Sequence, residues 1–176
     1  MRVRTIFALA GTAALLAIPV ATASPSNNAV VESASGGINW TIPLPNVFGV
    51  EVVSQPLAFN AVKYVDGRVS GRFEYIQKAG GDTFKFGVDV TCMNVYAGNR
   101  AKIGGIVTES SDPTIAVGMY GWFQVFDNGE GANAAADQSS LIGFGDEAAN
   151  EAFCNSPNLP RFGPWDVQGN VQVRTS

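Results

Sequence analysis

Apolar and polar residues alternate most regularly between residues 83 and 109. A period of two residues is typical of a strand with one buried face. A Gly98-Asn99 step divides this segment, and these residue types favour a two-residue hairpin turn. The turn would place Cys92 opposite Gly105. In the segment before the turn, every second residue is apolar, and we expect these residues on the buried face. They are Phe84, Phe86, Val88, Val90 and Cys92.

A second hairpin is predicted immediately before this segment, with an Asp66-Gly67 turn at its tip. A four-residue loop at 78–81 would then place Phe73 opposite Phe86, and Glu74 opposite Lys85 on the outer face. The first strand fits less well, because a two-residue turn brings Asn60 onto the apolar face. A bulge near Asn60 would resolve this conflict.

Further short strands are expected near residues 38–42, 48–53, 115–126 and 139–144, and a closing strand at 167–173. Residues 146–153 are helix formers and predict one or two helical turns. The fold class is therefore all-β, a single antiparallel meander with one short helix near the C-terminus. Continuous hairpin connections and inward glycines favour a small closed or partly closed β-barrel, with a β-sandwich as the alternative.

The N-terminus has the pattern of a secretory signal peptide. A basic start with Arg2 and Arg4 precedes a short apolar run that ends in Ala21-Thr22-Ala23. We interpret residues 1–23 as the signal peptide, 24–36 as a flexible lead-in and 37–176 as a single β domain. This organisation predicts a secreted, extracellular protein with no stable membrane insertion after cleavage.

The net charge of the chain limits the classes of partner that it can bind. The chain has 11 basic and 15 acidic residues, with a net charge of −4, and loss of the two signal arginines makes the mature domain more acidic. An acidic surface repels phosphate, so nucleic acid is excluded as a partner class. Cys92 and Cys154 are the only cysteines, and in an exported chain an even pair predicts a disulfide.

The chain contains no histidine, which excludes Ser-His-Asp and Cys-His catalysis. Asp89 and Glu109 both fall at strand positions expected to face outward, and we interpret them as part of a solvated face rather than an acid/base pair. A set of aromatic side chains could line a cavity for a small apolar ligand, although a filled core is the competing interpretation. This set comprises Tyr64, Phe73, Tyr75, Phe84, Phe86 and Trp122.

Residues 127–137 gather oxygen-bearing side chains in a glycine-rich loop. Calcium prefers such oxygen ligands, so the loop is a candidate Ca²⁺ site, the one cofactor we consider. Its glycines do not fit the EF-hand pattern, and an ordinary turn-rich connection is the competing interpretation. The candidate ligands are Asp127, Asn128, Glu130, Asn133 and Asp137.

Four motifs carry a resemblance to a known group of proteins. They are Asp66-Gly67 followed by Gly71 and Phe73, the strand from Gly87 to Cys92, the segment from Gly98 to Gly105, and Asp127-Asn128-Gly129-Glu130-Gly131. In these motifs the chain resembles a group of small exported bacterial β-domain proteins of unknown function. The resemblance spans residues 59–173. It implies secretion and one β domain, and it implies no activity.

Three functions follow as hypotheses. The first is an exported, non-catalytic β domain that binds a small ligand or a cell-envelope or extracellular partner. The second, by analogy of fold alone, is a barrel-type cyclase or isomerase with an apolar cavity. The third is a calcium-stabilised structural module. The missing histidine and the aromatic-rich strands favour the first.

Overall fold

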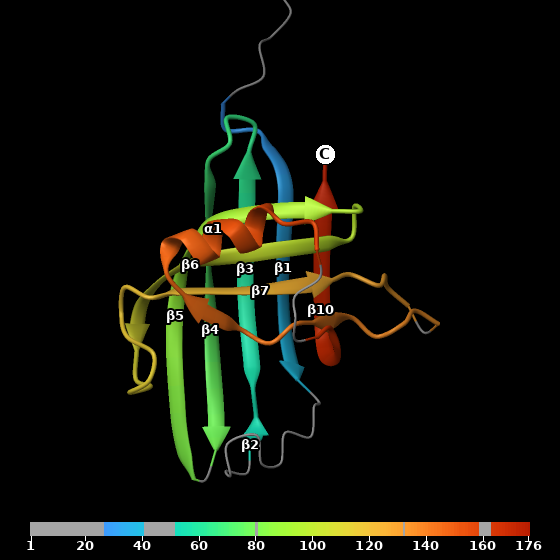
Figure 1. Ribbon diagram of the computed structural model, residues 1–176. Helices are drawn as coiled ribbons and strands as arrows, with labels where there is room; N and C mark the ends of the chain where they lie inside the picture. The colour runs from blue at the N-terminus through green and yellow to red at the C-terminus, as the bar shows by residue number, and fades with distance from the viewer. Residues whose placement is uncertain (1–26, 41–51, 80, 132, 159–162) are drawn as a thin grey trace, which may run out of the picture.

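A computed structural model describes residues 27–40, 52–79, 81–131, 133–158 and 163–176 (Figure 1). The elements, in chain order, are β1 (Val30–Trp40), β2 (Val52–Ser54), β3 (Pro56–Tyr64), β4 (Val69–Ala79), β5 (Asp82–Tyr96), β6 (Arg100–Ser110), β7 (Tyr120–Phe126), β8 (Gln138–Ser139), β9 (Gly143–Gly145), α1 (Glu147–Asn155) and β10 (Trp165–Thr175).

The strands pair in an order that follows the chain. β1, β3, β4, β5, β6, β7, β8 and β10 are antiparallel neighbours in succession, and β10 pairs with β1 again. β2 and β9 add short pairings to β4 and β7. The all-β antiparallel class and the short helix near the C-terminus are therefore confirmed, and the hydrogen-bonded pairings form a ring.

β5 joins two sets of strands that cross at a steep angle. In Figure 1, β1, β3, β4 and β10 run along one direction, whereas β6 and β7 lie across them. β5 pairs with β4 from Asp82 to Asp89 and with β6 from Phe86 to Tyr96, and the pairing with β6 has register shifts at Gly87/Val88 and Val90/Cys92. Bulges bend a strand and increase its twist, which lets one strand turn the corner between two layers.

The second bulge also changes which side chains of β5 face inward. Val88 and Val90 are buried, but beyond the bulge Met93 takes the inward position. Cys92 pairs with Gly104 rather than Gly105 and shares the outer side with Asn94. The prediction that Cys92 continues the buried parity is therefore wrong, because one extra residue in a strand inverts every later side chain.

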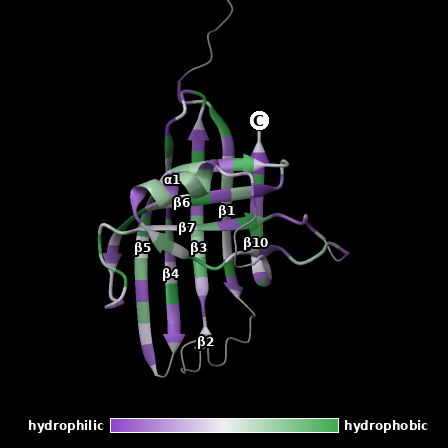
Figure 2. Ribbon diagram, viewed as in Figure 1, coloured by the Kyte–Doolittle hydropathy of each residue, from purple (hydrophilic) through white to green (hydrophobic). Residues whose placement is uncertain are grey.

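The interior is filled by side chains from all the long strands. Hydropathy alternates along these strands (Figure 2), and the apolar positions meet inside. The fully buried apolar residues include Ala34, Leu57, Ala61, Phe73, Val88, Ile103, Val107, Phe123, Val125 and Val171. Close packing of this kind is the main source of fold stability.

The hairpin registers differ from those predicted because the turns have different lengths. Tyr64 N donates to Arg68 O at the tip of the β3–β4 hairpin, so the loop holds one more residue than expected and Phe59 pairs with Phe73. The conflict at Asn60 is thereby resolved at the turn, not by a bulge beside Asn60. In the next hairpin, Ala79 pairs with Asp82, so the turn between β4 and β5 is tighter than the predicted four-residue loop.

That tighter turn moves the β4–β5 register by two residues. Tyr75 lies opposite Phe86, and Glu74 lies opposite Gly87 instead of Lys85. The buried face is unchanged, since a shift of two keeps the parity. The predicted pairs Phe73–Phe86 and Glu74–Lys85 are wrong.

β1 begins earlier than predicted. It starts at Val30, so the last part of the expected lead-in 24–36 belongs to the sheet, and the strand pairs on both sides, with β3 and β10. Its inward residues include the small Ala34 and Gly36, which gave too weak a hydrophobic pattern to predict a strand. The expected signal peptide and the whole region 41–51 lie outside the described residues. Within the described part of the chain, no helix has the length and apolarity needed to cross a membrane.

Candidate functional site

The aromatic residues expected to line a cavity do not gather around one space. Phe73 and Phe86 are buried in the core, with exposed fractions of 0% and 3%. Phe73 packs edge-on against Phe123 with ring centroids 5.0 Å apart, and Phe86 contacts both Tyr75 and Phe144. These rings fill the interior by contacting one another.

The other members of the aromatic set lie in different places. Tyr75 is half-buried, and its hydroxyl donates to Gln77 Oε1 at 3.3 Å. Burial raises the pKa of the Tyr75 hydroxyl above its ordinary value. Tyr64 lies near the β3–β4 turn beneath the Arg68 guanidinium, and Trp122 stacks on Phe153 of α1. Phe84 is partly exposed near the start of β5.

A hollow of about 400 Å³ lies on the outer face of β10, β1, β3 and β4. Its floor is made by residues without long side chains, Gly37, Ala58 and Gly169, and Ile76 adds an apolar wall. A Cβ atom built on Gly37 would meet nothing within 4 Å, so this position is open. Polar groups of Glu74, Asn39 and Gln168 complete the lining.

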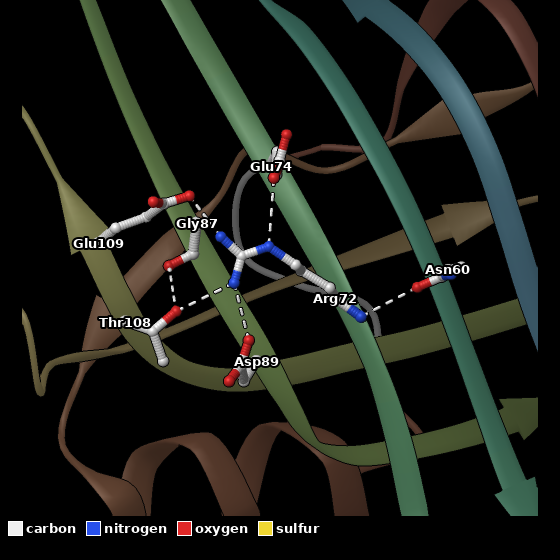
Figure 3. A network of polar contacts seen from close by, with 7 residues as sticks. All are labelled: Asn60, Arg72, Glu74, Gly87, Asp89, Thr108 and Glu109. Atoms are coloured by element: carbon white, nitrogen blue, oxygen red, sulfur yellow. Dashed lines mark hydrogen bonds and ion pairs between the residues drawn. The ribbon is translucent and has the colours of Figure 1, made fainter.

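Next to the hollow, Arg72 on β4 binds three carboxylates (Figure 3). Its Nε donates to Glu74 at 3.2 Å and its Nη1 to Asp89 at 2.8 Å, while Nη2 donates to Glu109. Thr108 Oγ1 accepts a further bond from Nη1 at 3.1 Å. Glu74 and then Asp89 raise the pKa of the Arg72 guanidinium, which keeps it charged.

Local backbone structure explains how these groups meet. Arg72 lies directly opposite Asp89. Gly87, the neighbour of Glu74 on β5, leaves room for the guanidinium, because a Cβ there would overlap Arg72 Nη2 and the Glu109 side chain. The register shift near Gly87 places both Thr108 and Glu109 on the exposed side of β6.

The hollow and the Arg72 network share one row across the sheet. Gly37 pairs with Ala58, Ala58 with Glu74, Glu74 with Gly87, and Gly87 with Glu109. We call these five residues the outer row. The sequence pattern predicts Asp89 and Glu109 on a solvated face but does not indicate Arg72 between them, since that contact depends on the actual strand register.

The carboxylates of the loop 127–137 bind the backbone of β10. Asp137 Oδ2 accepts from Val171 N at 2.6 Å, and Asp127 Oδ2 accepts from Val173 N at 2.9 Å. β8 pairs only with the first residues of β10, so these two side chains occupy donors that a neighbouring strand would otherwise use.

The remaining loop oxygens do not converge on a common point in the contacts described. Asp137 Oδ1 accepts from Asn128 N, and Asn128 Nδ2 donates to Ala136 O. Glu130 and Asn133 are exposed. Among the described residues, no three acidic, histidine or cysteine side chains form a group that could hold a metal ion. The calcium site remains a hypothesis.

The helix α1 covers the outer side of β5, β6 and β7, and a disulfide fixes it there. The predicted Cys92–Cys154 bond is confirmed. Gly104, the neighbour of Cys92 on β6, gives the helix room, since a Cβ there would crowd Asn150 and the Cys92 sulfur. Asp146 caps the N-terminus by accepting from Ala149 N at 2.9 Å.

The sheet supplies the positive charge that the last turn of α1 lacks. Lys102, 1% exposed, donates to Phe153 O at 3.2 Å and Ser156 O at 2.7 Å. A cation at a helix C-terminus interacts favourably with the helix dipole. Burial, and then the charge of Arg100, lowers the pKa of Lys102. This lysine therefore has a structural role in docking α1.

The comparisons with known proteins identify no relative. No protein-family model, no curated protein sequence and no solved structure matches the chain significantly.

Proposed function

We propose that this protein is an exported, non-catalytic binding domain that holds an extracellular partner against the outer row. One observation carries the proposal: a hollow floored by small residues adjoins a fixed set of charged side chains on the same sheet face. Glu74 belongs to both features, because it lines the hollow and binds Arg72. A partner seated over Gly37 and Ala58 would therefore reach the charged network as well.

The packed interior favours an external site over an internal one. Phe59 and Phe73 both contact Phe123 at centroid distances of 5.3 and 5.0 Å, and Trp40 contacts Tyr75 at 5.8 Å. Edge-to-face packing of this kind stabilises a core and occupies the space that a ligand would need. The chain also lacks histidine, the commonest general acid/base.

The chemistry of the outer row suggests the kind of partner. The hollow is lined mainly by apolar atoms of residues such as Ile76 and Ala58, so it suits an apolar side chain. The adjoining network sets three carboxylates against a single guanidinium, an excess of negative charge. We infer a protein segment that carries an apolar side chain next to a basic one.

Export belongs to the same proposal. The N-terminal pattern is that of a signal peptide, and the Cys92–Cys154 disulfide is consistent with an oxidising, extracellular setting. The motif resemblance to small exported bacterial β domains supports this location.

Capture of partners on two matched variants tests the proposal. Gly37→Phe places a ring in the hollow at a position with free space, whereas Ala148→Phe adds the same ring to an exposed site on α1. Wild-type protein and Ala148→Phe should retain the same proteins from culture medium and envelope extracts, and Gly37→Phe should lose them. Equal capture by all three, or no specific capture by wild type, would contradict the proposed function.

A further inference from the structure

A lysine, an asparagine and a glutamate meet where β5 crosses the ends of β1 and β3. Glu32 and Lys63 are cross-strand neighbours on β1 and β3. Lys63 Nζ lies 3.5 Å from Glu32 Oε2 and 2.7 Å from Asn94 Oδ1 of β5. An amine, a carboxamide and a carboxylate are therefore in contact, and none of the three belongs to the outer row.

We propose that Lys63 and Asn94 form an intramolecular amide bond, with Glu32 as the proton carrier. The Lys63 ammonium gives a proton to Glu32, and its free electron pair attacks Asn94 Cγ. The Cγ–Nδ2 bond then breaks as Nδ2 takes the proton back from Glu32, and the departing ammonia takes one further proton from Nζ. The side chains become joined as Nζ–Cγ, and one ammonium ion is released into solution. No oxidant, cofactor or other reactant is needed.

The geometry brings the reacting atoms close together. Since a carbonyl bond is about 1.2 Å long, Nζ at 2.7 Å from Oδ1 lies within about 4 Å of Cγ. Proximity of this kind converts a slow reaction between two molecules into a step within one molecule, with effective concentrations of roughly 10⁵ M or more when the alignment is good.

Neighbouring hydrogen bonds fix the orientation of the two groups that Lys63 contacts. Asn94 Nδ2 donates to Cys154 O at 3.0 Å and to Asn155 Oδ1 at 3.3 Å, so the carboxamide presents its oxygen to the lysine. Glu32 Oε2 accepts from Val95 N at 3.2 Å, which holds the carboxylate beside β5.

The surroundings are also partly shielded from solvent. The side chains of Lys63 and Glu32 are 26% and 21% exposed.

The bond would connect parts of the fold that the disulfide does not. It joins β3 to β5 across 31 residues, whereas Cys92–Cys154 joins β5 to α1. Together the two bonds would hold β5 to two different elements just beyond its second bulge, a useful property for a domain exposed to extracellular proteases.

Intact mass spectrometry of the purified wild-type protein, followed by peptide mapping, tests the proposal. We expect a mass lower by one ammonia than that of the disulfide-bonded chain, and a branched peptide joining residues 63 and 94 after proteolysis. Glu32→Gln and Lys63→Arg should have their full calculated masses, whereas the control Lys85→Arg, at an exposed position, should remain one ammonia light.

A wild-type mass reduced only by the two hydrogens of the disulfide would overturn the proposal, whatever the variants do. So would an ammonia loss mapped to a peptide that lacks residue 63. Both results are independent of whether the outer row binds a partner.

Discussion

Replacing Phe73 by alanine separates a packed core residue from a ligand-lining one. Phe73 has no exposed surface, pairs with Phe59 across the strands, and contacts Phe123 edge-on. If the ring lined a ligand cavity, its removal would mainly enlarge that cavity. If the ring is part of a filled interior, its removal leaves a void that rigid neighbours cannot close.

The structure sets the expected magnitude. Phe→Ala at a fully buried site lowers the free energy of unfolding by about 3–5 kcal/mol, of which the edge-to-face contact with Phe123 contributes about 1 kcal/mol. For a domain of this size, each kcal/mol lowers the melting temperature by about 2–4 °C, so Phe73→Ala should melt about 10 °C below wild type. Phe84→Ala, at a partly exposed position, should lose about 1 kcal/mol.

Urea denaturation of the oxidised proteins, followed by tryptophan fluorescence, measures these differences. Equal slopes of unfolding free energy against urea would show that the two-state comparison holds. A loss below about 1 kcal/mol for Phe73→Ala would refute the filled interior, and with it the main reason for placing the binding site outside.

Three other perturbations have defined outcomes. Arg72→Met should lower the unfolding free energy by about 1–2 kcal/mol in low salt and by less in 1 M salt, because the lost ion pairs are partly exposed; an equal effect of Arg174→Met would contradict this. Burial raises the pKa of Tyr75 in the folded state. The stability contributed by neutral Tyr75 is therefore complete below the ordinary tyrosine pKa and is lost as the pH rises above that value. Tyr75→Phe should therefore reduce the alkaline loss of stability, measured by denaturation between pH 8 and about pH 11. Calcium should leave the melting temperature unchanged if Asp127 and Asp137 serve only to bind β10; a rise on adding calcium, reversed by a chelator, would support the calcium hypothesis instead.

The strand periodicity predicted much of the fold because burial enforces it. The alternation in β4, the first part of β5 and β10 identified which side chains face inward, and the helix-forming residues 146–153 identified α1. The cysteine count predicted the disulfide for chemical reasons that need no coordinates. These are local or compositional signals, which sequence carries directly.

Register and bulges could not be read from the same pattern. A turn one or two residues shorter or longer leaves the composition of both strands unchanged, yet it moves Glu74 from Lys85 to Gly87. The Arg72 network depends on that register, so the sequence pattern alone pairs Glu74 with Lys85 and leaves Asp89 and Glu109 as exposed charges. The first part of β1 was not predicted, because small inward residues such as Ala34 carry little hydrophobic signal.

The hollow that we propose as the binding site was not anticipated from the sequence, for a related reason. Aromatic side chains suggest a cavity as readily as a core, and only the ring contacts distinguish the two. The hollow is made by the small residues Gly37 and Ala58, on strands brought together by tertiary pairing. A feature formed by missing atoms leaves no motif in the sequence.

Photo-crosslinking from the hollow in the producing cells tests the proposed function most directly. A photoreactive phenylalanine analogue at position 58 would lie on the floor of the hollow, and the same analogue at position 148 provides a matched control on α1. We predict a discrete crosslinked species from position 58 only, with the crosslinked segment of the partner carrying an apolar and a basic residue. No crosslink from position 58, or the same species from both positions, would contradict binding at the outer row.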